Sequence, residues 1–65
     1  MVLTINGERE TVDAATVATL LATLGYEGTF FAVARNGELV RKADWARTNL
    51  AEDDRIEIVT PRQGG

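Results

Sequence analysis

The sequence contains no cysteine and no histidine among its 65 residues. Without cysteine there are no disulfides and no thiolate nucleophiles, and without histidine there is no imidazole general base. Both absences also remove the ligands that zinc and related metals use most often, so we predict no metal site. The lack of cysteine is compatible with the cytoplasm, which is the location we expect.

Long apolar runs are missing as well. No segment approaches the roughly 20 apolar residues that a membrane-spanning helix needs, and no basic start followed by an apolar core indicates a signal peptide. The chain has 7 Lys and Arg against 10 Asp and Glu, a formal net charge of -3. An acidic surface repels phosphate backbones, so we expect neither nucleic acid nor a membrane as partner.

The short length limits what the protein can do by itself. With 65 residues the chain is large enough for one domain, which leaves little room for a deep pocket walled by its own side chains. Enzymes that act on small molecules need such a concave site. Size therefore favours a carrier, a binding module or a subunit over an enzyme.

Alternating apolar residues and turn signals predict five strands and one helix. Asn-Gly dipeptides at 6–7 and 36–37 tolerate the positive φ angles of tight hairpin turns. We expect strands at 1–5, 8–12, 30–35, 38–40 and 55–60. The third is so apolar that we expect cover on both of its faces, and the second reads as a polar edge strand. Strands with a helix on one face predict a two-layer α+β fold.

One segment has a clear helical pattern. Thr16 is a good N-cap, and Val17, Leu20, Leu21 and Leu24 form one apolar stripe. Gly25 follows at the position of a left-handed C-terminal cap. The stretch 41–48 is ambiguous, and we expect a one-turn helix or an irregular segment there, anchored by Trp45.

Several large or charged side chains admit both a functional and a structural interpretation. Trp45 and the pair Phe30-Phe31 could form a docking patch, but a domain this small needs its aromatic residues in the core, which we favour. The acidic run at 52–54 does not have the spacing of an EF-hand loop. We interpret it as a solvated turn.

The last five residues differ in character from the rest. Pro61 has no N–H and cannot extend a sheet, Arg62 and Gln63 are polar, and Gly64-Gly65 ends the sequence. We expect a folded domain at 1–60 and a flexible tail at 61–65. The final carboxylate is ionised at neutral pH, so it can attack the α-phosphorus of ATP and become an activated acyl-adenylate. Such chemistry needs no catalytic side chain on this chain.

The sequence resembles the ThiS family, the sulfur carriers of thiamine biosynthesis, along nearly its whole length. The similar segments are NGE at 6–8, TVATLL at 16–21, FAVARNGELV at 31–40, Trp45, DRIEIV at 54–59 and Gly64-Gly65. The block at 32–40 is the most specific of them, whereas the final Gly-Gly carries the function.

This resemblance implies a ubiquitin-like β-grasp fold, in which the helix lies across a mixed sheet and the first and last strands are central and parallel. It implies a carrier that binds no cofactor itself. An E1-like adenylyltransferase would activate Gly65 with Mg-ATP, and a sulfur donor such as a cysteine desulfurase would convert it to a thiocarboxylate. Thiazole synthase would then accept the sulfur. Gly64, Gln63, Arg62 and Pro61 would contact these partners.

Three alternatives share much of this pattern. A carrier for molybdopterin synthesis would have the same fold and the same adenylation chemistry, and so would a ubiquitin-like protein modifier joined to lysines through Gly65. A plain β-grasp binding module would have the fold alone, and its Gly-Gly would be incidental.

Overall fold

The computed structural model describes residues 1–28 and 30–60. Its elements, in chain order, are β1 (Val2–Ile5), β2 (Glu8–Thr11), α1 (Val17–Leu24), β3 (Ala32–Arg35), β4 (Glu38–Val40), the 3-10 helix η1 (Lys42–Arg47) and β5 (Arg55–Val59). Within these residues no helix has the length and apolar character required to cross a bilayer.

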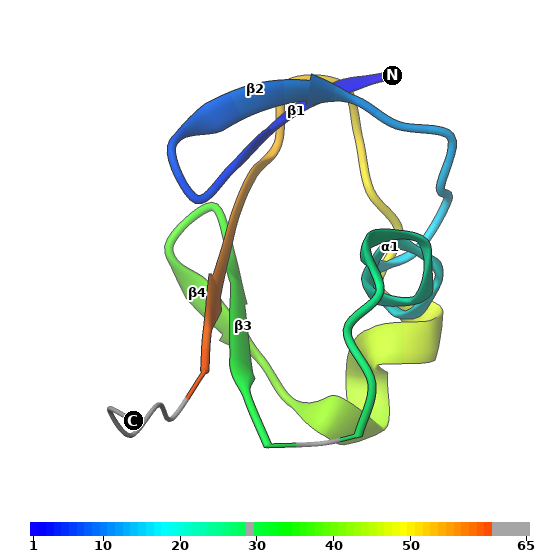
Figure 1. Ribbon diagram of the computed structural model, residues 1–65, viewed down its shortest axis with the longest axis vertical. Coiled ribbons are helices and arrows are strands. Elements are labelled where there is room, and N and C mark those ends of the chain that lie inside the picture. Colours follow the sequence, from blue (N-terminus) through cyan, green and yellow to red (C-terminus); the bar gives the residue numbers. More distant parts are fainter. Residues whose placement is uncertain (29, 61–65) are drawn as a thin grey trace.

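The described strands form one mixed sheet in the order β2-β1-β5-β3-β4. β1 and β5 are parallel neighbours, and all other pairings are antiparallel. Helix α1 and η1 lie on one side of this sheet (Figure 1). The arrangement is the predicted α+β, ubiquitin-like β-grasp fold, with the first and last strands inside the sheet and parallel as expected.

Both Asn-Gly dipeptides form the predicted hairpin turns. Asn6 and Gly7 have φ angles of 50° and 87°, and Asn36 and Gly37 have 52° and 87°. Positive φ at both central residues is the signature of a type I′ turn, whose twist matches that of the two flanking strands. The turns fix the registers that pair Ile5 with Glu8 and Arg35 with Glu38.

Helix α1 has the caps that its sequence predicts. The amide of Thr19 donates to the Thr16 hydroxyl at 3.2 Å, and Gly25 adopts the left-handed conformation at φ 87°. Val17, Leu20 and Leu21 are buried, whereas Leu24 at the end of the stripe is only partly buried. A helix of 8 residues is marginal by itself, so its packing on the sheet holds it in place.

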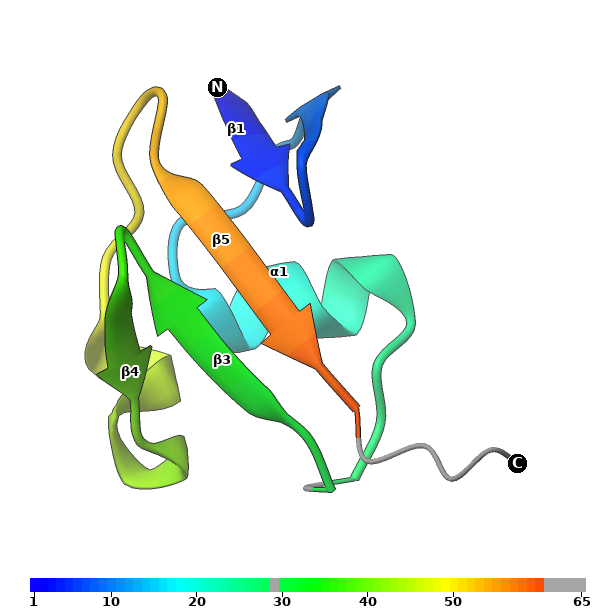
Figure 2. The same ribbon diagram turned by 90° about the vertical axis from the view of Figure 1, so that its left-hand side faces the viewer.

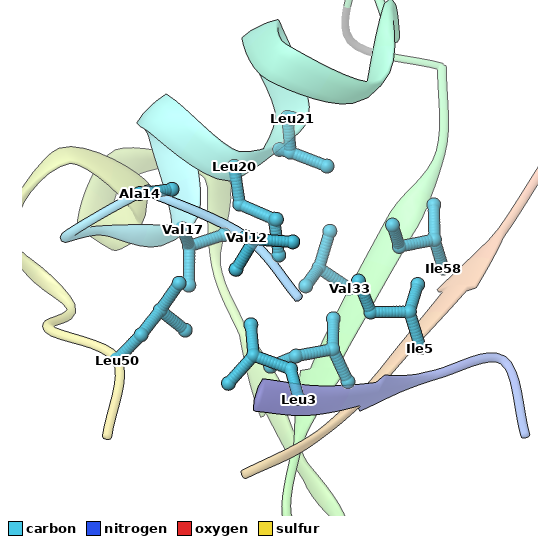
Figure 3. Close-up of a cluster of buried hydrophobic side chains, with 11 residues drawn as sticks. Leu3, Ile5, Val12, Ala14, Val17, Leu20, Leu21, Val33, Leu50 and Ile58 are labelled. Atoms are coloured by element: carbon cyan, nitrogen blue, oxygen red, sulfur yellow. The ribbon is translucent and has the colours of Figure 1, made fainter. Parts of the chain in front are cut away.

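The core lies between α1 and the inner face of the sheet. Side chains of the helix meet those of the central strands in Figure 3. The buried apolar residues are Leu3, Ile5, Val12, Ala14, Val17, Leu20, Leu21, Val33, Leu50, Ile56 and Ile58. β5 alternates as predicted, with its two isoleucines in the core and Arg55, Glu57 and Val59 outside.

Several predicted boundaries and environments were wrong. The third strand begins at Ala32 rather than at residue 30, because the pairing with β5 ends at Ala32 and Val59. Phe30 therefore precedes the sheet and is 80% exposed. Cover on both faces of β3 was also wrong, since Ala32 is exposed on the outer face. The second and last strands each end one residue earlier than predicted, and the ambiguous segment is the 3-10 helix η1.

Candidate functional site

The predicted reacting residue Gly65 lies outside the described residues, as do Gly64, Gln63, Arg62 and Pro61. The same holds for the predicted domain boundary after residue 60. What the structure describes is β5, the strand that leads toward this segment, and the surfaces at its two ends.

An apolar surface borders the last residues of β5. Phe30, Phe31, Ala32 and Val59 line an open hollow of about 320 Å³, and we call these four residues the apolar patch. Phe30 and Val59 are 80% and 63% exposed, so the lining of the hollow is accessible to a partner. Ala32 is the cross-strand partner of Val59, so the patch joins the start of β3 to the end of β5. These two strands lie side by side in Figure 2. Contiguous exposed apolar side chains are a common feature of interaction sites, which makes the patch a candidate docking surface.

The patch rests on a cluster of aromatic rings. The Phe31 ring stacks on Trp45 with centroids 5.2 Å apart and planes 8° apart, and the Tyr26 ring contacts Phe31 at 5.3 Å. The indole N–H of Trp45 donates to the Val40 carbonyl at 3.0 Å, which fixes the tryptophan to β4. All three rings pack against the core. The core interpretation is thus confirmed for Trp45 and Phe31 as partly buried residues, and it is wrong for Phe30.

The beginning of β5 is surrounded by polar groups. Asp54 is 6% exposed, although the sequence suggested a solvated turn. Its carboxylate accepts hydrogen bonds from Arg35 Nε at 2.7 Å, Asn36 Nδ2 at 2.9 Å and the Ala51 amide at 2.8 Å. Burial by itself raises the pKa of Asp54, but these three donors and the charge of Arg35 outweigh it and hold the pKa below its ordinary value.

The other two acidic residues of the run at 52–54 have separate structural contacts. Glu52 accepts a hydrogen bond from the Val2 amide at 2.9 Å, and Asp53 pairs with Arg9 at 3.3 Å. Within residues 1–28 and 30–60 no cluster of three or more acidic side chains is placed to hold a metal ion. Through these contacts the acidic run links the loop before β5 to β1 and β2.

Both hairpin turns hold β5 through their asparagine side chains, a role that sequence reasoning missed. Asn36 Oδ1 accepts from the Arg55 amide at 2.9 Å, and Asn6 Oδ1 accepts from the Ile58 amide at 2.8 Å. β1 ends at Ile5, and Asn6 continues its ladder along β5: its backbone amide donates to the Ile56 carbonyl at 2.9 Å, and its side-chain oxygen accepts from Ile58 where a strand would use its backbone carbonyl. The strand that leads to the tail is therefore held from both sides.

Known proteins resemble the chain in sequence and in structure. The model of the ThiS family matches residues 3–65. The crystal structure of a thiamine biosynthesis protein (ThiS) from Geobacter metallireducens superimposes with a TM-score of 0.83 and 32% identity over 100% of both chains. A solution NMR structure of a thiamine biosynthesis protein from the same organism superimposes with a TM-score of 0.79 and 32% identity, over 100% of this chain and 87% of the other.

A longer relative contains a similar segment. A thiazole synthase from Paramagnetospirillum magneticum is 41% identical over 66 residues, which span 100% of this chain. The chain spans only 20% of the length of that relative. The likeness therefore concerns one segment of the longer protein.

Proposed function

The chain belongs to the ThiS family, and from this premise we propose that it is a sulfur carrier of thiamine biosynthesis, which presents its Gly65 carboxylate to enzymes. The observation that carries the proposal is the family match, which runs through Gly64-Gly65. The carrier binds no cofactor and catalyses nothing itself. We place it in the cytoplasm with its partner enzymes.

The proposed chemistry proceeds at the last carboxylate. An E1-like adenylyltransferase binds Mg-ATP, one carboxylate oxygen of Gly65 attacks the α-phosphorus, and pyrophosphate leaves. The terminal sulfur of a persulfide, made by a donor such as a cysteine desulfurase, then attacks the acyl carbon and AMP leaves. A thiol reduces the resulting S–S bond and leaves the thiocarboxylate. Gly64 has no side chain, so the last residues can enter a narrow channel, where Pro61, Arg62 and Gln63 contact its walls.

We further propose that thiazole synthase, the sulfur acceptor, docks on the apolar patch. The patch lies at the end of β5, directly before the tail that carries the sulfur. A segment similar to this whole chain also forms part of a thiazole synthase, which favours that enzyme as the occupant. Phe30 is suited to fill a pocket on the partner, since exposed aromatic side chains supply much of the binding energy at interfaces.

The experiment that tests the carrier role is the intact mass of the protein after reaction. Protein whose starting mass matches a chain ending at Gly65 is incubated with an adenylating enzyme, Mg-ATP and a sulfur source. We expect one oxygen to be replaced by sulfur, and fragmentation to map the change to Gly65. A variant without Gly64 and Gly65 should keep its circular dichroism spectrum and gain no sulfur.

Two outcomes would contradict the carrier proposal. An unchanged mass in the presence of an active adenylating enzyme would overturn it. Isopeptide conjugates on lysines of other proteins, without thiocarboxylate, would indicate a protein modifier instead.

A further inference from the structure

The two Asn-Gly turns carry a reactive pair of groups that the carrier role does not use. In an Asn-Gly sequence the glycine nitrogen can attack the asparagine side-chain carbonyl carbon, because glycine has no side chain to obstruct the approach. The chain has this dipeptide at Asn6-Gly7 and at Asn36-Gly37, and all four residues are exposed. The two turns therefore have equal intrinsic reactivity, and any difference between them must come from the fold.

The hairpin geometry opposes this reaction at both turns. The attack forms a five-membered ring, which requires the asparagine ψ angle to rotate far from the roughly +30° of a type I′ turn. The side-chain oxygen of each asparagine is also held by an amide of β5, at 2.8 Å for Asn6 and 2.9 Å for Asn36. Each backbone amide is fixed as well, since Asn6 donates to Ile56 and Asn36 donates to Arg55. Reaction must wait for local opening of the turn.

The turns differ in one hydrogen bond. Asn36 Nδ2, which belongs to the leaving group of the reaction, donates to the buried carboxylate of Asp54 at 2.9 Å. Within the described residues Asn6 has no corresponding side-chain donor bond. We propose that Asn6 is the site of spontaneous deamidation in the folded protein, and that Asp54 protects Asn36. This inference does not depend on the carrier role.

The step is balanced without any added oxidant or cofactor. The amide nitrogen of Gly7 loses its proton to solvent base and bonds to Cγ of Asn6. Water then donates a proton to Nδ2, the Cγ–Nδ2 bond breaks, and ammonia leaves. Water then opens the cyclic imide at one of its two carbonyls. One product is aspartate at position 6, and the other is isoaspartate, in which the backbone runs through the side chain.

The two products affect β5 differently. An aspartate keeps an oxygen that can accept the hydrogen bond from the Ile58 amide. An isoaspartate adds a methylene to the backbone of a two-residue turn, so the register of β1 and β2 can no longer close in the same way. Isoaspartate formation should therefore release the end of β5 on the side of β1.

The experiment is to incubate the folded protein at mildly alkaline pH and to digest samples over time. Mass spectrometry then measures the replacement of NH₂ by OH in the peptides that contain Asn6 and Asn36. We expect Asn6 to convert at least about tenfold faster than Asn36, the ratio that corresponds to one hydrogen bond of about 1.5 kcal/mol to a charged acceptor. In denaturant the two rates should be equal and both faster. Conversion of Asn36 as fast as Asn6 in the folded protein would overturn the proposal.

A variant tests the protecting group directly. Asp54→Ala should raise the conversion rate of Asn36 to that of Asn6 or above, whereas Asp13→Ala removes an exposed charge and should leave the ratio unchanged. Hydrogen exchange of the Asn6 and Asn36 amides, which donate to β5, gives a second measurement of local opening in the unaltered protein. Slower exchange at Asn36 supports the proposal, and equal or faster exchange contradicts it.

Discussion

Directly before its first residue, β5 is fixed to the end of β3 and the β3–β4 turn by the buried carboxylate of Asp54, whereas at its last residues it borders exposed apolar side chains. Asp54 next to the beginning accepts three hydrogen bonds, and Val59 at the end is 63% exposed beside Phe30. The two ends of the strand therefore have different environments, one buried and hydrogen-bonded and the other exposed and apolar. Changes at its beginning should act on folding, and changes at its end should act on partner binding.

The largest effect is expected at the beginning of β5. Asp54→Ala removes three hydrogen bonds and leaves Arg35 and Asn36 without their acceptor. We expect a loss of about 2–3 kcal/mol in the free energy of unfolding, with Arg35 partly rescued by water. Urea denaturation followed by circular dichroism measures this loss. Asp13→Ala should change stability by less than about 0.5 kcal/mol, and a similar loss in both variants would contradict the assignment.

A smaller effect of a different kind is expected at the end of β5. Phe30→Ser should weaken binding to thiazole synthase about tenfold, or about 1.4 kcal/mol, while the free energy of unfolding stays unchanged. Leu39→Ser is the matched control, because Leu39 is 68% exposed on β4 and does not line the hollow. Titration calorimetry gives both Kd values. An unaltered Kd for Phe30→Ser would contradict the proposal that the apolar patch binds thiazole synthase.

The smallest expected effect is a decrease in the free energy of unfolding at low pH. The pKa of Asp54 is lowered in the folded state from its ordinary value of 3.8, so its contribution to stability is present above that value. The contribution is lost as the pH falls through the lower folded pKa. We expect the free energy of unfolding to decline below about pH 4 by a fraction of the Asp54→Ala loss. The free energy of unfolding of Asp54→Asn should fall less steeply with decreasing pH than that of the unaltered protein. An equally steep fall in both would show that Asp54 is not the cause.

The regular parts of the fold follow from short-range signals. The Asn-Gly turns, the caps of α1 and the alternation of β5 each depend on a few neighbouring residues, and the structure confirms them. Phe30 was misplaced because strand composition does not say where pairing stops. That limit is set by Val59, the last paired residue of a strand far along the chain.

The site could be predicted only in part. The run at 52–54 looked uniformly solvated, but a signal for Asp54 was present, because it continues the alternation of Ile56 and Ile58 on the buried face. The partners of its carboxylate could not be predicted, since Arg35 and Asn36 reach it only through the pairing of β3 with β5. The roles of Gly64 and Gly65 remain predictions from the family resemblance.

The parallel pairing of β1 and β5 has a mechanical consequence. The two strands are joined by hydrogen bonds from Thr4 to Asp54 at 3.0 Å, from Asn6 to Ile56 at 2.9 Å and from Ile58 to the Asn6 side chain at 2.8 Å. A force that pulls β5 forward against β1 slides the strands past each other and loads these bonds together. A force applied along β5 at its last residue is therefore shared by these three hydrogen bonds, whereas a force that peels one strand from the other loads them one after another.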